Sequence, residues 1–213
     1  MSLQYLRQNW DDVIARTIEH LQISLLALAL ALPIAILLGI LAVRFASLRF
    51  SILAVIGVLY TVPSLVVLVF LIPSQGIGNR PILIMLVMYA QLFLVRNIVA
   101  GLRGVDPATL EAAWGVGMTG TQVFRRVWLP LALPVIIAGI RIALVTIIGL
   151  AVFGGLISGG GLGRILFEGI ARDYPSMVLA GIIAITALSL VVDLTLRGLE
   201  RFTPVSRALR STR

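Results

Sequence analysis

The stretch DPATLEAAWGVGMTGTQVFRRVWLP, residues 106–130, is amphipathic and lies between two long apolar segments. Its first half predicts a short helix, because Asp106 is a favoured N-cap residue and Pro107 then occupies the first helical position, where a missing N–H costs nothing. Gly115 and Gly117 are poor helix formers and predict a hinge. The stretch is therefore expected to begin with a capped helix that ends in a glycine turn.

The second half of the stretch predicts another short helix. Thr119 and Gln122 have the spacing of a capping box, and Leu129-Pro130 is expected to end the helix. The two helices would expose large apolar side chains with no domain of their own to bury them: Leu110, Trp114, Val123, Phe124 and Val127. Such a surface predicts a protein partner.

The composition excludes several classes of protein. The 213 residues are 60% apolar, which is more than a soluble domain contains, and cysteine is absent. His20 is the one histidine, so zinc constellations are mostly excluded, and it is expected to be an interfacial residue. All 17 basic residues are arginine, and because a P-loop requires lysine, the chain is not expected to bind ATP through a Walker A motif. The arginines flank apolar runs instead of clustering on a polar domain, which argues against nucleic acid as a partner.

The apolar runs predict an all-α membrane protein with about five transmembrane helices in a single domain, residues 1–213. The mean hydropathy of +1.09 agrees with this class. The expected spans are 21–43, 50–72, 81–102, 131–156 and 174–192. Residues 1–20 are expected to form an interfacial segment, residues 164–173 a short surface helix, and residues 197–213 a basic tail.

Several arginines are expected at the membrane edges. Asp193 and Arg197 lie one turn apart and can pair, and Arg141 is expected to reach the interface or to pair with an acid. Arg96 is expected to extend to the cytoplasmic surface. With five spans, one side of the membrane carries 12 arginines and the other side carries 5. The arginine-rich side is the cytoplasmic one by the positive-inside rule, which places the N-terminus outside and the 106–130 loop and C-terminus inside.

Eight residues in the spans are candidates for the wall of a translocation pathway: Tyr60, Thr61, Pro63, Ser64, Gln91, Phe93, Asn97 and Thr146. Pro63 frees backbone groups that need protein or water as partners, and an ordinary packing kink explains it equally well. Gln91 either faces a pore or hydrogen-bonds a neighbouring helix, and the second interpretation is preferred.

The 106–130 stretch resembles the EAA loop of binding-protein-dependent ABC importer permeases. The residues that carry the resemblance are Glu111, Ala112, Ala113, Gly117, Val127, Leu129 and Pro130, with Val127 where the family usually has isoleucine. The resemblance implies that the loop is a cytoplasmic coupling element that docks into a cleft on a partner ATPase. It also implies a type I importer permease fold, similar to that of methionine permeases.

Residues 50–170 further resemble the osmoprotectant branch of the family, the permeases for glycine betaine, carnitine and choline. The segments 91–95 and 146–155 depart from that branch. The resemblance implies a permease subunit, not an enzyme, in the inner membrane of a bacterium or archaeon. Its implied partners are a second permease copy or a related permease, a cytoplasmic ATPase dimer that binds the ATP and magnesium, an external substrate-binding protein and membrane lipid. No cofactor is expected on this chain itself.

Three alternatives stay open at this point. The first is an importer permease for another small solute, such as methionine. The second is a stand-alone secondary transporter or channel, although no acid lies at the centre of a span and no inverted repeat is evident. The third is an intramembrane enzyme, although the sequence offers no nucleophile and base as a set.

Overall fold

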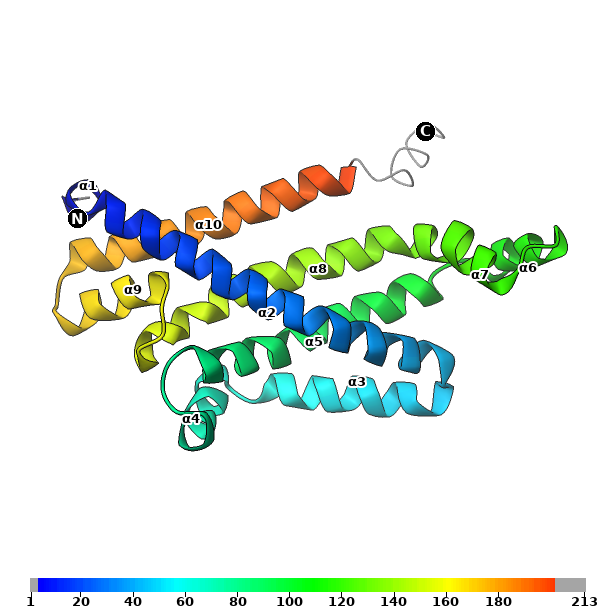
Figure 1. The fold of residues 1–213 in the computed structure, drawn as a ribbon, viewed down its shortest axis with the longest axis horizontal. Helices are drawn as coiled ribbons and strands as arrows, with labels where there is room; N and C mark the ends of the chain where they lie inside the picture. Colours follow the sequence, from blue (N-terminus) through cyan, green and yellow to red (C-terminus); the bar gives the residue numbers. More distant parts are fainter. Residues whose placement is uncertain (1–3, 202–213) are drawn as a thin grey trace.

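The computed structural model describes residues 4–201, and these residues form a bundle in which the long helices run along one axis (Figure 1). The helices in chain order are α1 Gln4–Gln8, α2 Trp10–Arg44, α3 Ala46–Thr61, α4 Ser64–Gln75, α5 Asn79–Arg103, α6 Pro107–Gly115, α7 Gly120–Val123, α8 Leu129–Ala151, α9 Leu162–Ala171 and α10 Pro175–Arg201. A π-helical turn, Phe124–Trp128, joins α7 to α8, and a 3₁₀ segment, Val152–Ile157, follows α8.

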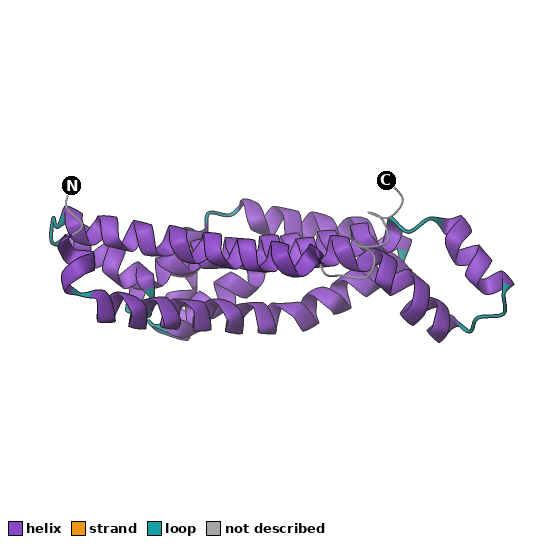
Figure 2. Cartoon of the chain, turned by 90° about the horizontal axis from the view of Figure 1, so that it is seen from above, coloured by secondary structure: helices purple, strands orange, loops and turns teal. Residues whose placement is uncertain are grey.

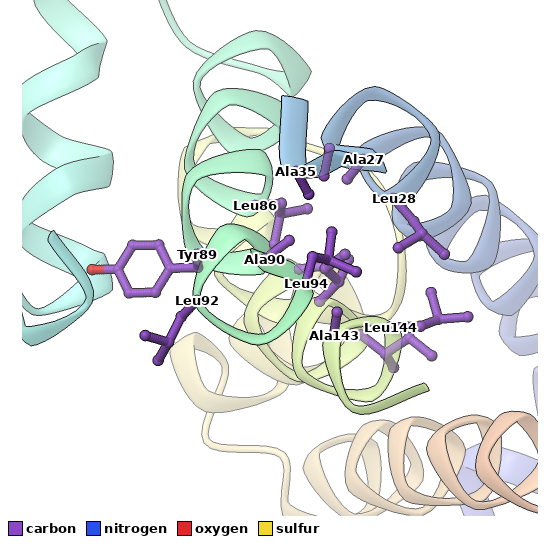
Figure 3. Packing of buried hydrophobic residues seen from close by; sticks show 14 of the residues in the cluster. Ala27, Leu28, Ala35, Leu86, Tyr89, Ala90, Leu92, Leu94, Ala143 and Leu144 are labelled. Carbon is purple, nitrogen blue, oxygen red and sulfur yellow. The ribbon is translucent and has the colours of Figure 1, made fainter. Parts of the chain in front are cut away.

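Helix α5 is the centre of the bundle, because α2, α3 and α8 all pack against it. Small residues permit these close approaches: the contact face of α2 carries Ala27, Ala31 and Ala35, all fully buried. Gly139 on α8 lies directly against the Asn97 side chain of α5, where a Cβ would overlap it. Figure 3 shows Leu86, Ala90 and Leu94 of α5 facing this shared core.

The expected number of spans agrees with the structure, but the second span is not one helix. Among the described residues, four helices are long and apolar enough to cross a membrane, and α3 and α4, bent by 91° at their break, make a fifth if the pair is taken as one span. The break follows from Pro63, which has no N–H, and from Val62, whose backbone is extended (φ −67°, ψ 129°). The prediction of a single span at 50–72 is therefore wrong in its geometry.

The predicted interfacial segment, residues 1–20, is divided in the structure. Helix α2 begins at Trp10 and continues into the first span, so that part of the segment extends that span. Helix α1 lies against the start of α10, where the Tyr5 N–H donates to Ser176 Oγ at 2.9 Å and the rings of Tyr5 and Tyr174 meet edge to face. Of the predicted basic tail, residues 202–213 lie outside the described residues.

The two ends of the bundle are built differently. Helices α6 and α7 extend beyond one end as a hairpin, whereas α1 and α9 lie at the opposite end (Figures 1 and 2). Helix α9 confirms the short helix expected at 164–173, and it is amphipathic: Leu162 and Ile165 are buried while Arg164 is exposed. The 106–130 loop and the predicted surface helix thus occupy opposite ends of the molecule.

Candidate functional site: the 106–130 loop and the broken span

The loop begins with the helix that its sequence predicts. Asp106 caps α6, and its Oδ1 accepts a hydrogen bond from the Ala108 N–H at 3.0 Å, with Pro107 at the first helical position. Helix α6 ends in a Schellman arrangement, in which the Met118 N–H donates to the Ala113 carbonyl and the Gly117 N–H donates to the Trp114 carbonyl. Gly117 takes the left-handed conformation that this ending needs, with φ +83°.

The second half of the loop begins as predicted but does not end as predicted. The Thr119 N–H donates to Gln122 Oε1 at 2.9 Å, which is one half of the expected capping box. Leu129-Pro130 does not stop the helix, because α7 continues through the π-helical turn into α8. In that turn the Leu129 N–H donates to the Phe124 carbonyl, five residues back, so the hydrogen-bond pattern shifts just where Pro130 lacks a donor.

The π-helical turn also ties the loop to the end of α5. Trp128 Nε1 donates to the Leu102 carbonyl at 2.6 Å, and Leu102 lies in the last turn of α5, where carbonyls lack partners within the helix. The Trp128 ring also meets Phe124 edge to face, with centroids 6.2 Å apart. The hairpin is therefore connected to two helices, to α8 through the chain and to α5 through Trp128.

The motif residues divide between the tip and the base of the hairpin. Glu111, Ala112 and Gly117 are exposed on the tip, whereas Val127, Leu129 and Pro130 are half-buried at the base. Ala113 is buried within the hairpin. The tip also exposes Trp114 (54%) and Val116 (79%), so it presents an apolar surface that projects away from the rest of the bundle.

The second candidate region is the break between α3 and α4. The Tyr60 ring lies 5.5 Å from both the Tyr89 and the Phe93 ring centroids, which makes a three-ring cluster beside the break. The Tyr89 hydroxyl donates to the Val62 carbonyl and so satisfies a group that the break leaves without a helical partner. Figure 3 shows the Tyr89 ring projecting away from the core residues of α5. Thr61 and Pro63 are exposed at the break, and Ser64 begins α4.

The other pathway candidates do not join this cluster. Gln91 is buried, and its Nε2 donates to the Ala31 carbonyl of α2 at 3.2 Å. This bond agrees with the prediction that Gln91 hydrogen-bonds a neighbouring helix. Asn97 donates to the Phe93 carbonyl and packs on Gly139 of α8. Thr146 is half-buried on α8 and donates to the Ile142 carbonyl one turn earlier. These three side chains bond to helix backbones within the bundle.

Arg96 does not extend to the end of its helix as expected. A Cβ at Gly57 would lie 3.4 Å from a guanidinium nitrogen of Arg96, so the head group sits against α3. Gly57 lies about 16 Å from the Ala46 end of α3 at the helical rise per residue. The guanidinium thus lies beside Gly57, part of the way along α3.

The structure confirms that Arg141 and Arg197 pair with an acid, which is Asp193 for both. Arg141 Nη1 lies 2.8 Å from Asp193 Oδ1 and Arg197 Nε lies 2.7 Å from Asp193 Oδ2. The carboxylate of Asp193 therefore bridges α8 and α10 at one level of the bundle.

Glu19 and His20 have a structural role that their sequence did not predict, and the expected interfacial position of His20 is wrong. This side chain is fully buried: its Nε2 donates to the Ile148 carbonyl at 2.9 Å and its Nδ1 accepts from the Leu162 N–H at 3.3 Å. Glu19 Oε2 accepts from the Gly161 N–H at 2.9 Å. Glu19 and His20 therefore hold the glycine loop that precedes α9 against α2. In the sequence, the only indication of this role is that two adjacent polar residues stand at the start of an apolar run.

On the opposite side of α9, surface charges are paired along the helix. Glu168 contacts Arg164 at 2.6 Å and Arg172 at 3.3 Å. The hydrogen bond from Arg164 holds the pKa of the Glu168 carboxyl below its usual range. These contacts neutralise part of the charge on this face of the helix.

The bundle of apolar helices, with its broken span and the hairpin that projects at one end, has the architecture of a multi-pass membrane protein. The family model described as "Binding-protein-dependent transport system inner membrane component" matches residues 31–203, and the chain belongs to this family.

The chain is similar to curated permeases over nearly its whole length. It is 40% identical to the "Carnitine transport permease protein OpuCB" of Listeria monocytogenes, over 98% of this chain and 95% of that protein. It is 38% identical to the "Choline transport system permease protein OpuBB" of Bacillus subtilis (strain 168), over 93% and 92%. It is 36% identical to the "Glycine betaine/carnitine/choline transport system permease protein OpuCB" of the same organism, over 93% and 92%.

Solved structures confirm the expected importer-permease fold. A chain of the MetNI methionine ABC transporter in an inward-facing conformation superposes with a TM-score of 0.79 at 23% identity, over 94% of this chain and 98% of that one. A chain of an amino acid ABC transporter solved with histidines superposes with a TM-score of 0.73 at 20% identity, over 94% and 96%. Both likenesses concern the fold alone.

Proposed function

We propose that this permease subunit imports a small quaternary-ammonium osmoprotectant, such as glycine betaine, carnitine or choline. The observation that carries the proposal is 36–40% identity, over at least 92% of the chain, to permeases named for these solutes. The methionine transporter shares the fold at only 23% identity, so it is the weaker guide to the substrate.

In this proposal the hairpin of α6 and α7 couples the permease to a cytoplasmic ATPase dimer that binds ATP and magnesium. The exposed Trp114 and Val116 at its tip suit a hydrophobic cleft on such a partner. The π-helical turn and the bond from Trp128 to the Leu102 carbonyl would carry the movement of the ATPase to α8 and α5.

A second permease copy, or a related permease, completes the pathway, because five spans from one chain are few to enclose a polar route. An external binding protein delivers the solute at the end that carries α9. The chain is oriented with its N-terminus outside and its C-terminus in the cytoplasm, as the distribution of 12 and 5 arginines favours.

The test of the substrate is calorimetry on the cognate external receptor. Glycine betaine, choline, carnitine and proline betaine are titrated against methionine and other amino acids. We expect tight binding of at least one quaternary amine. Tight binding of an amino acid without a quaternary nitrogen, with no betaine bound, would reject this substrate class. Co-purification of an ATPase with the permease separately tests the importer assignment against a stand-alone transporter.

A further inference from the structure

One seam of the bundle brings aromatic rings and an arginine together. Helix α3 packs along α5, and Tyr89, Phe93 and Arg96 follow one another on one face of α5 at the spacing of helical turns. Gly57 and Tyr60 lie one turn apart on α3 and meet this face: Tyr60 contacts the two rings and Gly57 contacts the arginine. The seam therefore has an aromatic part and a cationic part, one helical turn apart.

In the aromatic part, the roles of the three rings differ. Tyr89 is only 5% exposed, and its hydroxyl is already bonded to the Val62 carbonyl at the helix break, so this ring is a buried neighbour of Tyr60. Tyr60 and Phe93 are half-buried and keep accessible surface. A quaternary ammonium group has no N–H to donate, and the faces of aromatic rings are the groups that attract it.

In the cationic part, Arg96 is exposed and its guanidinium lies beside Gly57 of α3. None of the aspartates and glutamates whose side chains the structure describes, all within residues 4–198, pairs with it. An uncompensated guanidinium facing lipid is costly, so intramembrane arginines face a water-filled route or meet an anionic group. A carboxylate is the ligand that the planar guanidinium binds best, through two parallel hydrogen bonds.

We infer that this seam is a transient subsite for a zwitterionic quaternary amine, with Arg96 holding the carboxylate and Tyr60 and Phe93 facing the trimethylammonium group. Phe93 and Arg96 are about 5 Å apart along the helix axis, which is the scale of glycine betaine or carnitine. The inference rests on the proposed function and goes beyond it, because it assigns the two ends of the solute to named residues. Choline has no carboxylate, so Arg96 distinguishes it from the zwitterions.

The test measures transport by the permease with its ATPase in proteoliposomes, at saturating concentrations of the solute-loaded receptor. We expect Arg96→Gln to reduce uptake of glycine betaine and carnitine about tenfold or more while choline uptake changes less than about twofold. Arg96→Lys keeps the charge without the planar fork and should recover part of the zwitterion uptake. An equal reduction of all three solutes, or no reduction, would overturn the assignment of Arg96.

The aromatic part predicts no discrimination between choline and the zwitterions, because all three solutes carry the trimethylammonium group. Tyr60→Leu and Phe93→Leu should slow zwitterions and choline to a similar extent, whereas Phe93→Tyr, which keeps the ring, should retain most uptake. The matched controls are Phe50→Leu, an exposed ring at the start of α3, and Arg80→Gln, an exposed arginine at the other end of α5. Unchanged uptake in Tyr60→Leu and Phe93→Leu would remove the rings from the subsite.

A labelling experiment tests the location independently of the solute. Because the chain has no cysteine, Arg96→Cys introduces a single thiol. We expect a water-soluble thiol reagent to modify it in the assembled complex, and lack of modification in every nucleotide state would place position 96 outside the route and overturn the inference. If the wild-type complex hydrolyses ATP but moves no quaternary amine, the proposed function itself fails, and the labelling result still reports whether position 96 faces water.

Discussion

At the scale of single residues, Gly117 is a position where the backbone conformation, and not a neighbouring atom, favours glycine. Its φ of +83° is unfavourable for residues with a Cβ, but a Cβ there would meet nothing within 4 Å. We therefore expect Gly117→Val to cost about 1–2 kcal/mol in the conformation of the hairpin, and Gly117→Asn to cost less, because asparagine tolerates this region. The readouts are ATPase co-purification and receptor-stimulated ATP hydrolysis.

Gly115 provides the matched control for this prediction. It is also free of neighbours within 4 Å, but it lies in α6 without a positive φ. Gly115→Ala should therefore leave coupling unchanged or improve helix stability slightly. If Gly117→Val couples as well as Gly115→Ala does, the left-handed turn is not required for docking.

His20 carries the second prediction at this scale. Replacement by leucine leaves the Ile148 carbonyl and the Leu162 N–H without their side-chain partner, and each such loss costs about 1–3 kcal/mol. We expect His20→Leu to lower the thermal stability of the purified permease, with His20→Gln less affected because its amide can still donate and accept. Equal stability of His20→Leu and wild type would show that the clamp contributes nothing. Burial of this residue could not be predicted from the sequence, because both of its partners lie more than 120 positions away.

At the scale of elements, the spans were predictable and their interruptions were not. Predominantly apolar runs of sufficient length identified the helices, because a span must cross the hydrocarbon core of the bilayer. The 91° bend at Pro63 and the continuation through Pro130 both involve proline in an apolar helix, with opposite results. The two sites differ in how the backbone hydrogen bonds around the proline are replaced. At the break, the Tyr89 hydroxyl donates to the Val62 carbonyl, whereas beside Pro130 the helix continues because the Leu129 N–H bonds to the carbonyl five residues back. Neither arrangement is visible in the local sequence.

The π-helical turn predicts how the loop is held to its helices. Trp128→Phe keeps an aromatic ring against Phe124 but removes the donor to the Leu102 carbonyl, at a cost of about 1 kcal/mol. We expect weaker stimulation of ATP hydrolysis by the loaded receptor, with the ATPase still bound, because the link to α5 is lost. Trp10→Phe, at an exposed ring far from the hairpin, serves as the control. A normal stimulation in Trp128→Phe would mean that α8 alone carries the coupling movement.

At the scale of the whole molecule, the two ends of the bundle have different surfaces, which suits a subunit that binds one partner at each end. The hairpin of α6 and α7 projects at one end, and the clamped loop and α9 lie at the other (Figure 1). The tip of the hairpin is apolar and exposed, whereas the surface of α9 is charged and paired through Glu168. The sequence indicated the hairpin through its motif, but the fastening of α9 to α2 depends on contacts between distant segments.

The orientation of these ends is the last prediction. The arginine bias places the hairpin in the cytoplasm and α9 outside, and the cysteine-free chain permits a direct test with single thiols and an impermeant reagent. Thr119→Cys at the exposed hairpin should react only in inside-out vesicles, and Arg172→Cys, exposed just after α9, only in intact cells. Gly160 would be a misleading site, because a Cβ there overlaps the Glu19 carboxylate and would disturb the clamp. Reaction of Thr119→Cys from outside intact cells would contradict the topology and, with it, the placement of the ATPase on the hairpin.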